Sequence, residues 1–292
     1  MGSRGFPVRR TLTGYAFLAP SLIGVGGFLL VPVLVVIVLS LHRWDLVSPA
    51  RWVGLDNYAG LLDDLAFWQS MLITGMFVAI VVPLQVVLGL LAAVLLDRRL
   101  PGSVVFRTIF VLPWISAPLA LGVVWRWIFD PSDGAVNRLT GVRIEWLSDP
   151  DLALPAVAAV TVWHYTGYVA LFFLAGLAGV PAQYHEAARI DGANALQTFR
   201  LITLPLFRPT TFFVVVTSLL TTFQTFDLVY AMTRGGPAGA TDVIASLIHR
   251  EGFVEFRMGR AAAMSVVLLL LLITVTVGQQ LHFRRRTTYE VS

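Results

Sequence analysis

Six long apolar stretches alternate along the chain with shorter segments that hold nearly all of the charged residues. Stretches free of acidic residues and arginine cover residues 11–41, 65–96, 108–125, 152–184, 209–226 and 261–281. A helix of about 20 apolar residues crosses the ~30 Å hydrocarbon core of a bilayer, and lipid offers no partner to unpaired backbone groups. The pattern therefore predicts six membrane-spanning helices at approximately residues 14–41, 68–96, 106–129, 153–179, 207–231 and 261–282.

The composition agrees with a chain whose solvent is mostly lipid. Hydrophobic residues make up 57% of the 292 positions and charged residues only 13%, and the mean hydropathy is +0.78. The chain has no cysteine, which excludes disulfides and thiolate chemistry. All 21 basic residues are arginines. In a membrane chain, arginines collect on the cytoplasmic side more often than they bind phosphates, so no nucleic-acid partner is expected.

The arginines also predict an orientation. If the spans alternate, the two termini and the loops after the second and fourth spans share one side of the membrane. These segments hold 12 arginines and four acids, a balance of +8, and the remainder holds nine arginines and 13 acids, a balance of −4. The positive-inside rule places both termini in the cytoplasm. No linker or repeat divides residues 1–292, which are predicted to form a single domain with an uncleaved first span.

Several kinds of chemistry are missing from the sequence. A phosphate-binding loop needs a lysine, and the chain has none, so ATP hydrolysis must come from another protein. His185 and Glu186 begin like a zinc-protease helix, but Arg189 stands where the second histidine belongs. There is no nucleophile-elbow motif and no pair of carboxylates within the spans. An enzyme, a metal site, a cofactor of the chain's own and a proton-driven carrier are therefore not expected.

The loop at residues 181–206 has the pattern of a short helix, a glycine turn and a second short helix. Pro181 suits a helix start, Glu186 and Arg189 can pair one turn apart, and Gly192 suits a helix end. From the residues alone, the loop is either an amphipathic linker on the membrane surface or a docking element for another protein.

The same loop resembles the EAA loop of ABC-importer permeases. The pattern E-A-A-x-x-D-G-A, a phenylalanine, then I-x-L-P and a further proline is filled by Glu186, Ala187, Ala188, Asp191, Gly192, Ala193, Phe199, Ile202, Leu204, Pro205 and Pro209. Residues 15–20, 54–58, 106–113, 125–127 and 235–237 are similar to carbohydrate permeases as well. The chain most resembles the maltose and glycerol-3-phosphate permease group, and within it an actinobacterial amino-sugar uptake permease, although it lacks the large outer domain of the maltose type.

This resemblance implies an all-α membrane protein with the type I ABC-importer permease fold. It implies a multi-pass subunit of the cytoplasmic (inner) membrane that pairs with a second, homologous permease and sits on two ATP-binding cassette ATPase subunits, which bind the ATP and magnesium. An extracellular sugar-binding protein would deliver the substrate, which crosses by alternating access. Coupling to the ATPase would fall to Glu186, Ala187, Ala188, Asp191, Gly192 and Ala193.

Two polar clusters at membrane depth are candidates for the solute path. Sugar sites combine amide or hydroxyl groups with aromatic platforms. Such residues interrupt the fourth and fifth spans, and the resemblance assigns substrate contacts to Thr161, His164, Tyr165, Tyr168, Gln224 and Thr225. The alternative is that these residues hydrogen-bond between helices or mark the membrane interface. For Asp227, near the outer end of its span, the simpler expectation is a solvent contact or an ion pair with Arg126.

Two other classes of protein remain open from the residues. A secondary carrier or channel would need an ion route within the spans, and none is visible. A membrane scaffold that recruits an ATPase has no use for polar clusters that are costly to bury.

Overall fold

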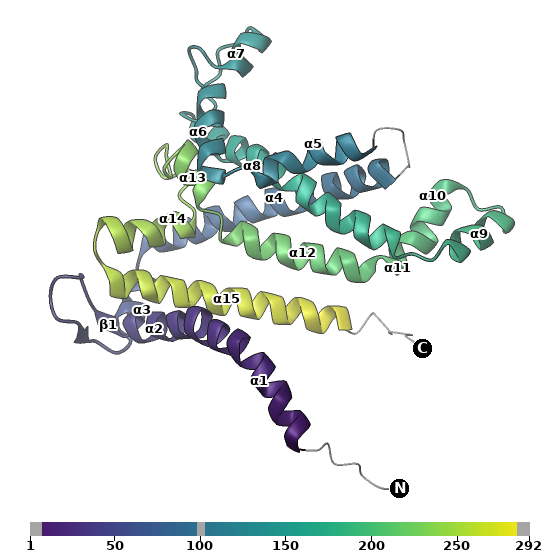
Figure 1. Ribbon diagram of the computed structural model, residues 1–292. Helices are drawn as coiled ribbons and strands as arrows, with labels where there is room; N and C mark the ends of the chain where they lie inside the picture. The colour runs from purple at the N-terminus through teal and green to yellow at the C-terminus, as the bar shows by residue number, and fades with distance from the viewer. Residues whose placement is uncertain (1–7, 98–102, 285–292) are drawn as a thin grey trace. The chain divides into compact units, whose positions relative to one another are not determined.

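The computed structural model describes residues 8–97 and 103–284, and most of them are helical (Figure 1). The amino-terminal part consists of α1 (Val8–Val25), the π-helical segment η1 (Gly26–Leu30), α2 (Val31–Ser40), β1 (His42–Arg43), β2 (Arg51–Trp52) and α3 (Asp56–Leu62). The middle part consists of α4 (Leu65–Asp97), α5 (Ser103–Ile115), α6 (Pro118–Ile128), α7 (Ala135–Thr140) and α8 (Pro150–Ala178).

The remaining elements begin with a run of short helices. They are α9 (Ala182–Ile190), α10 (Ala195–Thr198), the π-helical segment η2 (Phe199–Thr203), α11 (Leu204–Leu206), α12 (Arg208–Phe223), α13 (Asp227–Met232), α14 (Ile244–His249), the π-helical segment η3 (Arg250–Val254) and α15 (Met258–Arg284). The single sheet among the described residues is the antiparallel pair of β1 and β2.

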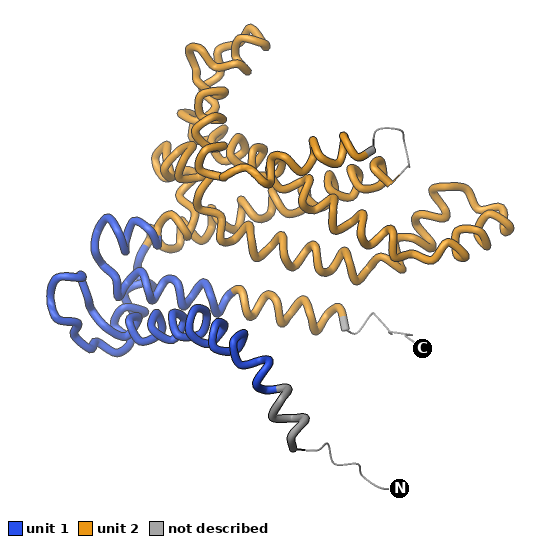
Figure 2. The backbone as a smooth tube through the Cα atoms, viewed as in Figure 1, with its two compact units in different colours: residues 1–64, 248–271 blue, residues 65–247, 272–292 orange. Residues whose placement is uncertain are grey.

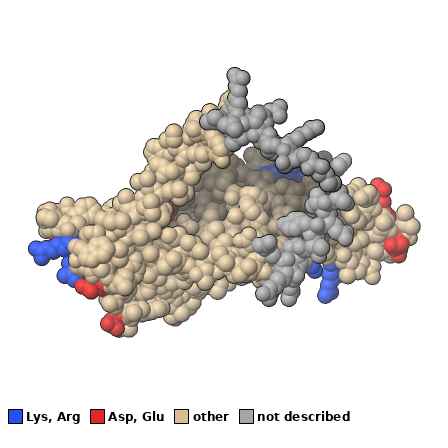
Figure 3. Space-filling model, turned by 90° about the horizontal axis from the view of Figure 1, so that it is seen from below, with Lys and Arg blue, Asp and Glu red and all other residues tan. Residues whose placement is uncertain are grey.

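Four helical stretches are long and apolar enough to cross a membrane, and two bent helix pairs raise the number to as many as six. The four are Tyr15–Ser40, Leu65–Asp97, Pro150–Ala178 and Met258–Phe283. The bent pairs are Val104–Ile115 with Pro118–Ile128, and Ala195–Leu206 with Arg208–Phe223. Side chains on the first stretch are largely exposed, which fits a lipid solvent. Figure 3 shows, on one face, few charged side chains and large areas of surface without any.

The predicted third span is broken by a bend of 97° between α5 and α6. Ala117 adopts an extended conformation because it precedes Pro118, and the residue before a proline is driven out of the helical region. Pro118 then starts the next helix, where its missing N–H is harmless. The sequence predicts one continuous span here, whereas the chain forms two separate helices.

The predicted fifth span is also divided. α12 begins at Arg208 after a bend of 68° and ends at Phe223, and α13 starts a new helix at Asp227. Residues 224–226 between them are not helical. The predicted span thus contains a stretch of irregular backbone at membrane depth.

The chain groups into two compact units, residues 1–64 with 248–271 and residues 65–247 with 272–292 (Figure 2). The first unit contains a network of ion pairs around the buried carboxylate of Glu251. Arg257 binds it at 3.0 Å and Arg260 lies 3.5 Å from it, and Arg260 also pairs with Asp64. These contacts join the two sequence segments of the unit. This division into two compact units does not test the prediction that residues 1–292 form a single domain.

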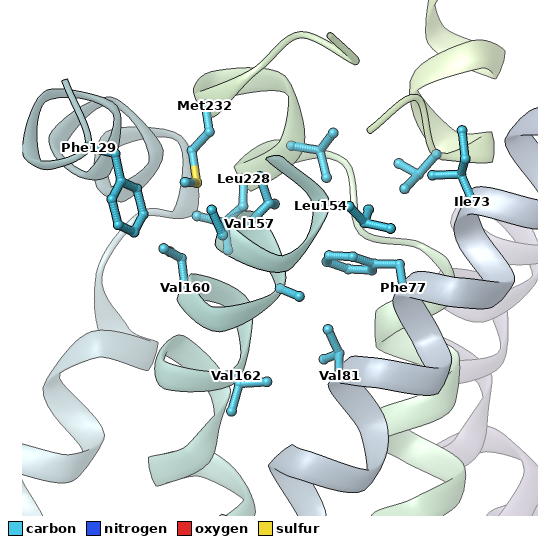
Figure 4. Packing of buried hydrophobic residues seen from close by; sticks show 14 residues of the cluster. Ile73, Phe77, Val81, Phe129, Leu154, Val157, Val160, Val162, Leu228 and Met232 are labelled. Atoms are coloured by element: carbon cyan, nitrogen blue, oxygen red, sulfur yellow. The ribbon is translucent and has the colours of Figure 1, made fainter. Parts of the chain in front are cut away.

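The core of the second unit forms where α4 packs along α8 (Figure 4). Phe77 and Val81 of α4 meet Leu154 and Val157 of α8, and Leu228 of α13 closes the cluster.

Two glycines of the second unit bring backbones unusually close together. A Cβ on Gly89 would overlap the side chain of Val169, and one on Gly167 would overlap the carbonyl oxygen of Phe110 in α5. α8 is therefore packed tightly against both α4 and α5.

Candidate functional site

The coupling segment, residues 181–206, forms the predicted helix, glycine turn and second helix. Pro181 is the N-cap of α9, and Gly192 ends the helix in the left-handed conformation at φ +75°. The N–H of Gly192 donates to the carbonyl of Arg189 at 3.2 Å, and that of Ala193 to the carbonyl of Ala188 at 2.9 Å. This pair of bonds is a Schellman motif, which satisfies carbonyls that would otherwise be left at the helix end.

The second half of the segment is fixed by a capping box. The side chain of Asn194 accepts from the N–H of Gln197 at 2.9 Å, and the side chain of Gln197 accepts from the N–H of Asn194 at 2.8 Å. Neither residue is among the predicted coupling residues, although an Asn followed three residues later by a Gln is a recognisable helix-start signal. The two motifs hold both short helices at defined angles to the turn between them.

The surface of the segment mixes charge with large apolar groups. Glu186 and Asp191 are exposed, whereas Ala188 is buried. Further along, Ile190, Leu196 and Leu201 are 86%, 74% and 70% exposed, and none of the three is among the predicted coupling residues. Exposed apolar groups gathered in one short segment are typical of a protein contact.

The predicted pairing of Glu186 with Arg189 is not seen. No ion pair joins the two side chains within the part of the chain that the structure describes. The carboxylate of Glu186 is therefore left on the exposed surface of α9.

The four predicted path residues of α8 share one face of that helix. Thr161, His164, Tyr165 and Tyr168 follow the spacing of three and four residues that places side chains above one another. Thr161 is fully buried and donates its hydroxyl to the carbonyl of Val157 at 2.9 Å. His164 is buried edge-on to the ring of Tyr165, and its Nδ1 has no hydrogen-bond partner among the described residues.

Tyr168 stacks on the indole of Trp114, with ring centroids 4.7 Å apart and planes 24° from parallel. Trp114 lies in α5 next to the bend and is not among the predicted path residues. Its signal in the sequence is weak, because a tryptophan beside Pro113 is equally typical of an interfacial anchor. The structure thus adds an aromatic platform to the α8 cluster.

Gln224 and Thr225 lie in the break between α12 and α13. Gln224 is exposed, and the hydroxyl of Thr225 donates to the carbonyl of Thr221 at 3.3 Å. Both flanking helices, α12 and α13, pack against α8. Irregular backbone at this depth is tolerated where it is buried in protein or lines a water-filled cavity.

Of the two simpler expectations for Asp227, an exposed side chain is seen and the ion pair with Arg126 is not seen among the described residues. No ion pair joins Asp227 to Arg126 in residues 8–97 and 103–284. Asp227 instead lies in the first turn of α13, immediately after the break.

A pocket of about 550 Å³ lies in the first unit, between the β1–β2 region and the start of α15. Arg43 and Arg51 are directly opposite each other in the two-stranded sheet, and both line this pocket. Like charges in that register are unfavourable, and neither guanidinium has an acidic partner within the described ranges. Backbone N–H groups of Ser48 and Val47 lower the pKa of Asp45 below its usual range, so this pocket residue stays ionised.

No group of three or more His, Cys, Asp or Glu side chains that could hold a metal ion occurs among the residues described here.

These features define a class of protein: a multi-pass membrane permease with broken helices at membrane depth and an exposed helix–glycine–helix loop. The family described as "Binding-protein-dependent transport system inner membrane component" matches residues 85–289, and the chain belongs to this family. It is therefore an inner-membrane permease subunit and not itself an enzyme.

Named permeases from other organisms are similar in sequence over nearly the whole chain. The probable ABC transporter permease protein YesP of Bacillus subtilis is 36% identical over 274 residues, 91% of this chain and 88% of that protein. The trehalose/maltose transport system permease protein MalF of Thermococcus litoralis is 32% identical, and the alignment covers 95% of this chain and 96% of that protein. The sn-glycerol-3-phosphate transport system permease protein UgpA of Agrobacterium fabrum is 34% identical, and the alignment covers 94% of this chain and 96% of that protein.

Solved structures share the fold. A chain of a bacterial ABC transporter that imports the acidic polysaccharide alginate has a TM-score of 0.84 at 22% identity, over 96% of this chain and 98% of that chain. A bacterial alginate ABC transporter was also solved in complex with a periplasmic protein carrying an alginate pentasaccharide. The predicted importer-permease fold and membrane location are confirmed. The orientation of the termini and the roles of individual site residues stay predictions.

Proposed function

We propose that this permease moves a sugar, in particular an amino sugar, into the cytoplasm as part of an ABC importer. The observation that carries the proposal is the stack of Trp114 on Tyr168, which lies on the same face of α8 as Tyr165. An aromatic face suits the weakly apolar face of a sugar ring, and the neighbouring hydroxyl and amide groups suit its hydroxyls. The names of the trehalose/maltose and glycerol-phosphate relatives support a small polyol substrate.

In this proposal each path residue has a stated role. Trp114 and Tyr168 hold the ring face, and Tyr165, Gln224 and Thr225 bind hydroxyls. The buried Nδ1 of His164 gains a partner when the path opens, and Thr161 lines the same face of α8. Asp227 would meet the nitrogen substituent of an amino sugar, since no arginine neutralises it within the described part of the chain.

The motor is a pair of partner ATPases that grip the coupling segment. Ile190, Leu196 and Leu201 supply an apolar contact, and Glu186 and Asp191 supply its polar edge. ATP binding closes the ATPase pair, and the capped helices transmit the motion through η2 and α11 to α12. A substrate moves in one direction only if the two facing states differ in free energy, and the ATPase supplies that difference.

Delivery by an extracellular binding protein is supported by the pocket that Arg43 and Arg51 line. Two unpaired guanidinium groups side by side are complementary to a carboxylate on an approaching protein. The predicted orientation puts this pocket on the outer side of the membrane. We place the docking contact of the binding protein there.

The aromatic stack gives a direct test of the path. Tyr168→Ala removes the platform, so sugar uptake by the assembled transporter is expected to fall at least about tenfold at sub-saturating substrate, in line with ~1.4 kcal/mol or more of lost ring contact. Tyr168→Phe keeps the ring and is expected to retain most of the activity. Uptake of radiolabelled sugar into proteoliposomes measures both. Equal uptake by wild type and Tyr168→Ala would remove the stack from the path.

The docking pocket has a separate test. Arg43→Glu combined with Arg51→Glu is expected to weaken stimulation of ATP hydrolysis by the binding protein at least about tenfold and to reduce its dependence on salt. Arg43→Lys with Arg51→Lys preserves the charge and should remain close to wild type. Stimulation that is unchanged by the charge reversal would place the docking surface elsewhere.

The proposal as a whole is tested by purification and reconstitution. Co-elution with a second permease and two ATPases, together with ATP turnover that requires both the binding protein and one sugar from a panel that includes amino sugars, is the expected result. Uptake by the chain alone, driven by an ion gradient, would indicate a secondary carrier. Co-elution with an ATPase but no solute flux with any sugar would indicate a scaffold.

A further inference from the structure

A second pocket, of about 480 Å³, lies in the second unit between α12 and the last turns of α15. α12 contributes Arg208, Phe212 and Val215 from one face, at the opposite end of the helix from Gln224. α15 contributes Gly278, His282 and neighbouring residues from its carboxyl-terminal turns. The site is therefore distinct from the proposed solute path.

The body of this groove is apolar and open. Phe212 stacks on Phe283 with ring centroids 4.3 Å apart, and the stacked pair forms one wall. A Cβ on Gly278 would meet nothing within 4 Å, so this glycine leaves room that any other side chain would fill. Val215 is seven positions after Arg208, which gives the groove a length of about 10 Å along α12 at 1.5 Å per residue.

One end of the groove carries the guanidinium of Arg208 and the imidazole of His282. α12 and the last turns of α15 run in opposite directions, so the start of α12 and the end of α15 lie at the same end of this helix pair (Figure 1). Arg208 starts α12 and His282 lies near the end of α15, and both exposed residues line the pocket. Neither has an ion-pair partner within the described residues. The sequence holds no acidic residue between 192 and 226 or between 261 and 289, so no carboxylate close in sequence offsets them. Gln279 adds an Oε1 atom that is buried without a hydrogen-bond partner.

We propose that this groove binds one anionic phospholipid. Its acyl chain would lie in the apolar groove, its phosphate would contact Arg208 and His282, and a hydroxyl of its headgroup would donate to Gln279. An acyl chain that moves from the bilayer into the groove leaves one apolar medium for another, so the hydrophobic effect contributes little. Selectivity must come from the charged end, which favours anionic over zwitterionic headgroups.

Native mass spectrometry of the purified full chain tests the proposal, with phosphatidylglycerol and phosphatidylcholine as competing probes. The wild-type protein is expected to retain one phosphatidylglycerol with at least about tenfold preference, equivalent to ~1.4 kcal/mol. Arg208→Gln with His282→Gln should abolish the preference. Gly278→Leu should exclude the lipid by filling the groove. Gly75→Leu is the matched control and should bind as wild type does, because Gly75 is also an exposed helical glycine at which a Cβ would meet no atom within 4 Å.

Four results would overturn the site. The first is equal retention of the two lipids by the wild type, and the second is unchanged binding by Gly278→Leu. The third is displacement of the lipid when the second permease assembles with the chain, which would make the groove a subunit interface. Displacement by inorganic phosphate would show that the charge alone is recognised, and it would likewise contradict a site that holds the acyl chain. None of these measurements depends on sugar transport.

Discussion

Replacing Gly192 by valine is expected to abolish sugar uptake and substrate-stimulated ATP hydrolysis while membrane insertion remains normal. Gly192 adopts φ +75° at the end of α9, where a β-branched residue is strained by about 1–2 kcal/mol. No atom lies within 4 Å of a Cβ at this position, so the strain acts on the turn and not on packing. Loss of the left-handed turn would release the Schellman bonds and misdirect both helices of the coupling segment.

Two variants separate the mechanical role of this turn from simple backbone strain. Gly192→Asn places a residue that tolerates the left-handed conformation at the turn, and it should keep most of the coupled activity. Gly141 has φ +70° and an equally empty surrounding, but it ends α7 in a different loop. Gly141→Val therefore carries the same strain and should remain coupled. ATP turnover and sugar uptake in proteoliposomes measure the coupling of each variant. Coupled activity in Gly192→Val would refute the role of the turn in transmitting motion from the ATPase.

Gly167→Ala is expected to lower the stability of the second unit by more than ~3 kcal/mol and to abolish transport. A Cβ on Gly167 would overlap the backbone carbonyl of Phe110, and a backbone atom cannot rotate away as a side chain can. α5 and α8 would have to separate, which would also disrupt the stack of Trp114 on Tyr168. The cost exceeds the ~1–3 kcal/mol typical of an overpacked core because the neighbour is main chain.

Gly75→Ala is the control for this substitution. Gly75 and Gly167 both lie within long helices, so replacing either by alanine gains about 1 kcal/mol of helix propensity. A Cβ at Gly75, however, would meet no atom within 4 Å. Gly75→Ala should therefore match or exceed the wild type in thermal unfolding of the detergent-solubilised protein. If both variants unfold at the wild-type temperature, the close approach of α5 and α8 is not important for stability.

Local signals in the sequence predicted much of this molecule. The apolar stretches predicted the membrane helices because the length needed to cross lipid is set by the bilayer. Gly192 and Pro181 predicted the helix and turn of the coupling segment, because caps depend on neighbouring residues only. The size of the bend at Pro118 in the third span was not predicted, because it depends on what packs around it.

The remaining features depend on contacts between distant residues. Trp114 joins the aromatic cluster only because α5 crosses α8 at Gly167, and no spacing along the chain reveals that crossing. The facing arrangement of Arg43 and Arg51 follows from strand register, which two-residue strands do not specify by pattern. The break after Phe223 has no glycine or proline to mark it. The roles of the twelve predicted coupling and path residues stay predictions.

The bend between α5 and α6 shortens the barrier that a solute has to cross. The 13 residues of α5 span about 20 Å and the 11 residues of α6 about 16 Å, so neither crosses a ~30 Å hydrocarbon layer alone. At 97° to α5, α6 adds almost nothing to the length along α5. In the proposed function, water would therefore reach toward Trp114, and a sugar bound there would have a shorter apolar barrier left to cross.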